Sequence, residues 1–211
     1  MNNEYFTFAE RVEAFLTEKK SRFISAGTEV SAESEAAAFI EEQRSSYKEA
    51  GHYVYAYRLS DTERFSDAGE PSGTAGAPVL NILKAEGMRN AIIVVTRYFG
   101  GVLLGTGGLT RAYSHCAKLL FGTGKVIKKV RCRKIFLAAD YVFWGKLQYF
   151  IGRSDVSLTR TDYTGRVDLE LVAREETIRR FIREITDLTN GRAETRVSES
   201  FYYEYPFSQR A

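Results

Sequence analysis

The 211-residue chain, with 44% hydrophobic and 27% charged residues, is long enough for two compact cores, and no apolar run approaches the roughly 18 residues of a membrane span. Its start, MNNEYFTFAE, lacks the basic and apolar regions of a secretory signal, so we expect a cytoplasmic protein without a membrane partner. The net charge of +3 hides a segregation, because residues 97–160 carry 12 Lys/Arg against 2 Asp/Glu, and such a block is typical of a face that attracts polyanions.

The first predicted elements are two strands and a helix. Alternating apolar residues predict strands at Val12–Leu16 and Arg22–Ile24, joined by a turn near Lys19–Lys20. Ser31 is expected to cap a helix that continues towards Tyr47, because acidic residues follow it and apolar residues then recur at helical spacing. The acidic and apolar residues of this helix are Glu33, Glu35, Ala36, Phe39 and Ile40.

The next segment contains two strands, a loop and a second helix. The aromatic run Tyr53–Leu59 predicts a strand, and the polar segment Ser60–Ser72 predicts a mobile loop. A helix is expected over Gly73–Lys84, with Pro78 in its first turn or at a kink. The continuous apolar run at Ala91–Tyr98 predicts a buried core strand.

A second domain is expected after Arg131–Lys134, where the pattern of elements restarts. The predicted elements are a strand at Ile135–Ala139, a helix near Phe143–Arg153, strands at Val156–Tyr163 and Val167–Val172 joined through Thr164–Gly165, a helix over Ile178–Leu188 stopped by Asn190–Gly191, and a strand at Glu194–Tyr205. Their order, βαββαβ, is that of the ferredoxin-like fold. We therefore predict an α+β protein with domains at residues 1–131 and 132–211.

Neither a metal nor a cofactor is expected. The two cysteines, Cys116 and Cys132, lie in unrelated contexts and are expected to be structural thiols. His115 precedes Cys116 directly, but no further ligands follow at the spacing of a zinc site.

Two segments carry candidate chemistry: DAGEPSGTAGAP at Asp67–Pro78, and a glycine-rich loop after the strand Ala91–Tyr98. Glycines allow the backbone to approach a ligand closely, and a helix N-terminus after the loop offers N–H groups to an anion. Arg97 and Arg111 bracket the loop and complement phosphate, while its aromatic residues can stack on bases. The alternative is a tight turn whose aromatic residues pack in the core. The loop glycines are Gly100, Gly101, Gly105, Gly107 and Gly108, and the aromatic residues are Tyr98, Phe99 and Tyr113.

Known nucleotide-binding motifs do not fit this loop. Gly100 and Gly105 have the spacing of a P-loop, but Thr106 follows where lysine is required. A dinucleotide fingerprint requires glycine where Thr110 stands. An NTPase and a Rossmann site are therefore rejected.

A hydrolase is the enzymatic alternative. Ser72 would be the nucleophile, His52 the base, and Glu70 or Asp67 the orienting acid. No G-x-S-x-G motif surrounds Ser72, however, and Ser-Gly-Thr after Pro71 is equally typical of a helix cap. A non-enzymatic role is favoured.

Two long motifs resemble the YigZ/IMPACT family, namely EPSGTAGAPVLNIL and VVTRYFGGVLLGTGGLTRAY. The resemblance covers essentially the whole chain, with weaker support from Lys20–Ile24 and His52–Arg58, and identifies it as a bacterial two-domain member. It implies a first domain similar to the ribosomal-protein-domain fold, also found as the fourth domain of elongation factor G. It implies a ferredoxin-like second domain resembling the last domain of that factor. A role in translation or its regulation is implied, since eukaryotic relatives act on the starvation-responsive initiation-factor kinase pathway.

The chain departs from the family pattern at two positions. Ala68 stands where many members have aspartate, and Leu103 stands where they have lysine. If that lysine contacts phosphate in relatives, this chain relies on Arg97 and Arg111, and its binding should be weaker or more salt-sensitive.

The leading hypothesis is a non-enzymatic RNA- or ribosome-associated protein, with a protein-binding regulator in a translation-control pathway as the rival. A continuous positive face spanning Arg97, Arg111 and Lys125–Lys134 is the arrangement that would favour RNA. The expected ligand- or nucleic-acid-binding residues are Glu70, Ser72, Gly73, Thr74, Arg97, Tyr98, Gly100, Gly101, Gly105, Gly107, Gly108, Arg111, Tyr113, Lys125, Lys128 and Lys129.

Overall fold

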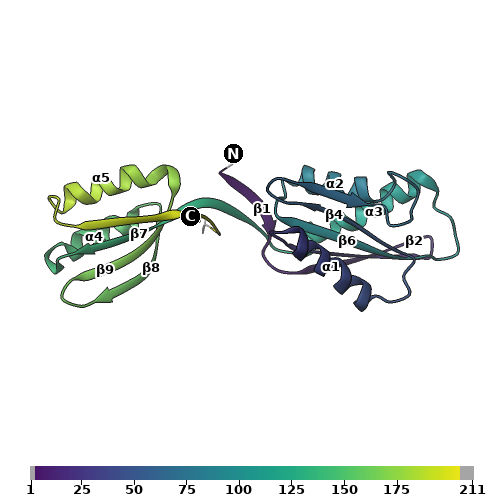
Figure 1. Cartoon of the computed structure of the whole chain (residues 1–211), viewed down its shortest axis with the longest axis horizontal. Helices are drawn as coiled ribbons and strands as arrows, with labels where there is room; N and C mark the ends of the chain where they lie inside the picture. Colours follow the sequence, from purple (N-terminus) through teal and green to yellow (C-terminus); the bar gives the residue numbers. More distant parts are fainter. Residues whose placement is uncertain (1–2, 205–211) are drawn as a thin grey trace. The chain divides into compact units, whose positions relative to one another are not determined.

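The computed structural model describes residues 3–204, which form two units (Figure 1). The N-terminal unit contains residues 5–128, and the C-terminal unit contains residues 129–204 with residues 3–4. Each unit combines helices with an antiparallel sheet, which confirms the predicted α+β class. No helix among the described residues is long and apolar enough to cross a membrane.

The N-terminal unit is built on a five-stranded antiparallel sheet that follows the short strand β1 (Glu4–Phe8). Its strand order is β2 (Val12–Glu18), β3 (Ser21–Glu29), β6 (Ala91–Tyr98), β4 (His52–Arg58) and β5 (Glu63–Ser66). The central strand β6 has the bounds that its apolar run predicts, and all but its last residue are buried. It therefore forms the middle of the sheet, covered on both faces.

Helices cover both faces of this sheet (Figure 1). Helix α1 (Glu33–Ser46) packs on the face that presents Ile92 and Val94, whereas α2 (Gly76–Ala85) and α3 (Gly105–Thr123) share a core with residues of the opposite face. Because successive side chains of a strand point to opposite faces, this double cover explains why β6 is apolar throughout.

Three sequence expectations for the N-terminal unit are wrong in detail. Ser31 does not cap α1; Ala32 holds the N-cap position, and the Glu35 carboxylate accepts the Ser31 backbone N–H at 2.6 Å. The segment Ser60–Ser72 is not simply a loop, because β5 lies inside it and pairs with the edge of β4. Of the glycines of the expected loop, Gly100 and Gly101 lie in the loop, whereas Gly105, Gly107 and Gly108 belong to α3, which begins at Gly105.

The C-terminal unit has the predicted ferredoxin-like order of elements. These are β7 (Val126–Ala139), α4 (Tyr141–Arg153), β8 (Val156–Tyr163), β9 (Val167–Arg174), the 3-10 turn η1 (Glu175–Thr177), α5 (Ile178–Leu188) and β10 (Glu194–Glu204). The strands pair in the antiparallel order β10-β7-β9-β8. Apolar residues of α4 and α5 share one core cluster with the sheet. Both helices therefore cover the same face.

The start of β7 differs from the sequence pattern, and one predicted strand end lies outside the described residues. Strand β7 starts at Val126, nine residues before the expected Ile135, because Val130 and Cys132 alternate with the basic residues and are buried. The basic segment is therefore strand and not linker. Of the expected final strand, Tyr205 lies outside the described residues.

Candidate functional site

A buried carboxylate organises one end of the N-terminal unit. The side chain of Glu70 is only 3% exposed, and its Oε1 accepts hydrogen bonds from Arg97 Nη1 at 2.6 Å and from the Tyr113 hydroxyl at 2.7 Å. Burial, together with the hydrogen bond to Glu70, raises the pKa of Tyr113 far above its ordinary value, so the hydroxyl remains a donor. The charge of Glu70 is thus neutralised inside the protein.

The guanidinium of Arg97 lies between two aromatic rings. Its centre is 5.4 Å from the ring of buried Phe23 and 5.6 Å from that of Phe99, and Nη2 donates to Ser21 Oγ at 3.3 Å. The same Ser21 hydroxyl accepts the backbone N–H of Gly100 at 3.2 Å. Arg97 thereby ties the end of β6 to the start of β3, and it faces the interior instead of a ligand.

The sequence-predicted residues therefore divide into an interior and a surface set. Glu70, Thr74, Arg97 and Tyr113 are buried. Ser72, Gly73, Gly101, Gly105, Gly107 and Arg111 are exposed, while Tyr98, Gly100 and Gly108 are half-buried.

Asp67 fixes the DAGEPSGTAG segment against helix α2. Its carboxylate accepts backbone N–H groups of Gly73 at 2.8 Å, Ala75 at 3.0 Å and Gly76 at 2.8 Å, so it caps α2 from outside the helix. Partial burial alone would raise the pKa of Asp67, but the three donors outweigh it and hold the pKa below its ordinary value. The segment is therefore a hydrogen-bonded turn.

Replacing this cap should give a pH-dependent loss of stability. Asp67→Asn should lower the free energy of unfolding by about 1 kcal/mol at pH 7. Because the pKa of Asp67 is lower in the folded state, its contribution to stability is complete above the unfolded-state pKa. That contribution is lost as the pH falls through the folded-state pKa. The difference in the free energy of unfolding between Asp67→Asn and the wild type should therefore become smaller below about pH 4. Urea unfolding at pH 7 and pH 3 measures this, with exposed Asp61→Asn as control; an equal loss at both pH values would contradict the assignment.

The hydrolase geometry is not assembled. His52 Nδ1 lies 3.0 Å from the Ala68 carbonyl, and Nε2 lies 3.8 Å from Glu70 Oε1. Among residues 3–204, no hydrogen bond joins His52 to Ser72, which is exposed in the turn after Pro71. These contacts assign His52 to the support of the Glu70 segment, and give Ser72 no general base in this structure.

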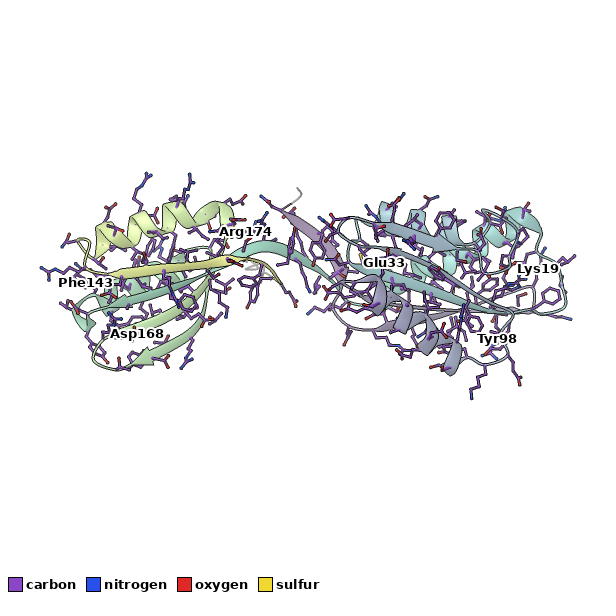
Figure 2. All side chains as sticks on the ribbon, viewed as in Figure 1. Lys19, Glu33, Tyr98, Phe143, Asp168 and Arg174 are labelled. Carbon is purple, nitrogen blue, oxygen red and sulfur yellow. The ribbon has the colours of Figure 1, made fainter. Side chains whose placement is uncertain are left out.

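A basic groove lies on the surface of the N-terminal unit, between β2 and the start of α3. It has a volume of about 250 Å³ and is lined by Leu16, Glu18, Lys19, Leu104, Gly108, Arg111, Ala112 and His115. Within the described part of the chain, Lys19, Arg111 and His115 form no ion pair, and Glu18 is the one carboxylate that lines the groove beside the cations Lys19 and Arg111. Figure 2 shows Lys19 and Tyr98 towards the same end of the unit. Of the residues that line this groove, only Gly108 and Arg111 were predicted as binding residues from the sequence.

The β2–β3 turn beside the groove holds two lysines in an unusual conformation. Lys19 has φ of 46° and Lys20 has φ of 66°, the left-handed region in which asparagine and glycine are favoured. Asn-Gly would adopt this two-residue turn with less strain, so the turn conformation does not account for the two lysines. Such a local cost points to a use for their charges.

The loop between β6 and α3 exposes apolar side chains next to the groove. Leu103 is 82% exposed, Phe99 55% and Val102 41%. Leu103 is directed to solvent and contributes nothing to the core. A longer charged side chain could occupy its position without repacking.

Within the N-terminal unit, the expected positive face is interrupted. Arg97 is buried, and the 19-residue helix α3 separates Arg111 near its start from Lys125 beyond its end by roughly 20 Å. Farther along β7, Arg131 and Arg133 pair with Glu175 at 2.9 Å, and Lys134 pairs with Glu170 at 2.7 Å. Lys125, Lys128 and Lys129 also have interaction partners. The basic count along the sequence therefore overstates the available charge.

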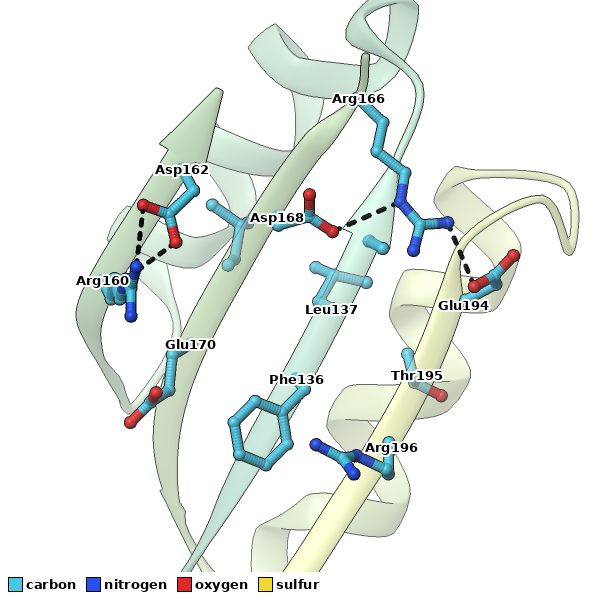
Figure 3. Close-up of a pocket in the computed structure, with 12 residues that line it drawn as sticks. Phe136, Leu137, Arg160, Asp162, Arg166, Asp168, Glu170, Glu194, Thr195 and Arg196 are labelled. Atoms are coloured by element: carbon cyan, nitrogen blue, oxygen red, sulfur yellow. Dashed lines mark hydrogen bonds and ion pairs between the residues drawn. The ribbon is translucent and has the colours of Figure 1, made fainter. Parts of the chain in front are cut away.

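The C-terminal unit contains a larger cavity, of about 460 Å³, on the sheet face opposite its helices (Figure 3). Sequence reasoning did not identify it. Its carboxylates are already paired: Arg160 binds Asp162, Arg166 binds Asp168 and Glu194, and Lys134 binds Glu170. Arg196 lies over the ring of Phe136 at 4.6 Å. Despite its size, this cavity offers fewer uncompensated charges than the basic groove.

The cysteines have the environment of structural thiols. Cys116 and Cys132 are both fully buried, and burial raises the pKa of each to about 11. Neither forms a disulfide. Among the described residues, no group of three or more His, Cys, Asp or Glu side chains is placed to hold a metal ion.

Comparison with known proteins defines the class to which this fold and loop belong. Residues 19–121 match the family model "Impact N-terminal domain", and residues 137–192 match a "Domain of unknown function (DUF1949)". The first match lies within the N-terminal unit and the second within the C-terminal unit. The buried Glu70–Arg97 pair, the glycine-rich loop and all the groove residues except Leu16 and Glu18 lie inside the first match.

The chain belongs to the IMPACT family. It is 35% identical over 207 residues to IMPACT family member YvyE of Bacillus subtilis, covering 97% of this chain and 95% of that protein. It is 32% identical to IMPACT family member YigZ of Escherichia coli, covering 82% and 87% respectively. A solved structure titled "Crystal structure of an hypothetical protein" is similar with a TM-score of 0.62 and 29% identity, covering 94% of this chain and 99% of that one.

Proposed function

We propose that the protein binds RNA, free or within the ribosome, through the basic groove of its N-terminal unit and takes part in translation or its regulation without catalysing a reaction. The observation that carries this proposal is the convergence of Lys19, Arg111 and His115 on one groove without ion pairs among the described residues. Phosphate is the ligand that the neighbouring cations Lys19 and Arg111 are suited to bind. Exposed residues of the adjoining loop and of the Ser72–Gly73 turn extend the proposed surface.

The Lys19–Lys20 turn provides a test in which stability and binding change in opposite directions. The double substitution Lys19→Asn with Lys20→Gly should raise the free energy of unfolding by about 1 kcal/mol or more, because both new residues tolerate positive φ. It should weaken RNA binding and reduce the slope of log K against log salt by roughly 1–2, since two cations are removed. Lys146→Asn, a charge change in the C-terminal unit, is the control.

The Leu103 position provides the matched gain of charge. Leu103→Lys should strengthen binding and increase the salt slope by about 0.7, one phosphate contact on single-stranded RNA. Its exposure of 82% predicts little change in stability. Fluorescence anisotropy with labelled RNA at several salt concentrations measures both effects.

Two results would contradict the proposal. A wild-type Kd above roughly 10⁻⁴ M at low salt would make nucleic acid the wrong partner. Unchanged binding and salt slope in the turn variant would place the RNA elsewhere. If a defined protein is instead captured and remains after nuclease treatment, the exposed Val102 and Leu103 favour a protein-binding regulator.

A further inference from the structure

One exposed aromatic ring beside the basic groove is held in a fixed position. Phe99, 55% exposed, is the first residue after β6, and the Arg97 guanidinium supports its ring at 5.6 Å. Arg97 is itself fixed by Glu70 and Ser21. The ring is therefore exposed to solvent on a support that is anchored in the interior.

The backbone after this ring is also fixed, and it contacts the turn that carries the lysines. A Cβ atom on Gly100 would lie 2.0 Å from the Lys20 carbonyl carbon, so the two backbones are in direct contact. Leu104 of the same loop lines the groove together with Lys19. The loop that carries the ring therefore also lines the groove, through Leu104, and contacts the turn that carries Lys19.

We propose that Phe99 stacks on an unpaired base of single-stranded RNA whose phosphates bind the groove; this inference rests on the proposed function. A basic groove beside an exposed aromatic ring is the combination by which proteins bind single strands, because phosphates follow the cations and bases stack on the ring. In an RNA duplex the faces of the bases are covered by their neighbours and cannot reach a side chain. The ligand is therefore single-stranded or locally unpaired RNA.

The aromatic character of residue 99 can be separated from its bulk. Phe99→Leu keeps an apolar side chain but removes the ring, whereas Phe99→Tyr keeps the ring. Binding to a 12-nucleotide single strand should weaken about 5-fold or more in Phe99→Leu and change less than about 2-fold in Phe99→Tyr. Binding to the matching duplex should be weaker than to the single strand in the wild type and the same in all three proteins.

Phe65→Leu is the matched control, because Phe65 is also an exposed phenylalanine, at 46%, but lies on the edge strand β5. Thermal unfolding of each variant reports whether it is folded. A second readout does not depend on Phe99→Leu folding: in the double variant Phe99→Trp with Trp144→Phe, tryptophan at 99 is the only one in the chain, and a stacked base should quench its fluorescence.

The outcomes separate this inference from the proposed function. If Phe99→Leu binds the single strand as tightly as the wild type, or if tryptophan at 99 is not quenched while the Lys19/Lys20 variant loses binding, the groove binds RNA and Phe99 does not stack. An equal loss for single strand and duplex in Phe99→Leu also overturns the inference, because it indicates a structural role. If the wild type binds neither the single strand nor the duplex, the proposed function itself is contradicted.

Discussion

Glu70→Gln is expected to lower the free energy of unfolding by about 3–5 kcal/mol, the largest effect of any single substitution that we predict. The change leaves the Arg97 guanidinium, whose side chain is 5% exposed, as a buried cation without a counter-ion. Removing one member of a buried pair costs more than the pair contributes, because the remaining charge has lost both water and its partner. A typical domain has only about 5–15 kcal/mol of stability, so the N-terminal unit would come close to unfolding.

Two further variants test this explanation. Glu41→Gln removes a charge from the exposed pair with Arg44 and should cost less than about 1 kcal/mol. Combining Glu70→Leu with Arg97→Met removes both buried charges and should recover most of the loss. Circular dichroism in urea follows both units, whereas the single tryptophan, Trp144 in α4, reports on the C-terminal unit. A loss in Glu70→Gln no larger than in Glu41→Gln would mean that the pair is not effectively buried.

Gly100→Ala is expected to lower the free energy of unfolding by about 3 kcal/mol and to abolish binding at the groove. The new methyl would lie 2.0 Å from the carbonyl carbon of Lys20, 2.2 Å from its oxygen and 2.3 Å from the Ser21 nitrogen. These are backbone atoms of a tight turn and cannot rotate away, so the loop and the Lys19–Lys20 turn must separate. Separation also breaks the hydrogen bond from Gly100 N–H to Ser21 Oγ.

The neighbouring glycine provides the control. Gly101 has φ of 80°, and no heavy atom of the described residues lies within 4 Å of the position that a methyl group would take, so Gly101→Ala adds backbone strain but no clash. It should cost about 1 kcal/mol and preserve RNA binding within a few-fold. Urea unfolding and RNA titration of both variants measure the contrast. Similar losses in the two would contradict the clash, because Gly100, unlike Gly101, does not have a positive φ.

Local sequence patterns were sufficient to predict most of the fold. The apolar run Ala91–Tyr98 specified a central strand, and the apolar stripe that begins at Ile178, with its Asn190–Gly191 stop, specified α5. Both residues of that stop have positive φ, as expected of a helix end. These signals are readable because each depends on residues close together in the chain. Strand β5 escaped prediction because its four residues are stabilised by the edge of β4.

The site was less predictable, because its essential contacts join distant residues. The Glu70–Arg97 pair spans 27 positions, and the contact of Gly100 with Ser21 spans 79. A count of charges assigns Arg97 to the surface, whereas its hydrogen bonds and two ring contacts place it inside. The signal available for Lys19 and Lys20 was the pair of lysines at a two-residue turn, where smaller residues are usual.

The buried anchor beneath the loop has a consequence for how this protein can diverge from its relatives. Because Arg97, Glu70 and Ser21 hold the ends of the loop from within, the outer positions Val102 and Leu103 carry almost none of the folding energy. Sequence drift at these two positions can therefore alter affinity or partner preference one substitution at a time. The loop thus combines anchored ends, which the fold needs, with outer positions that can change at little cost in stability.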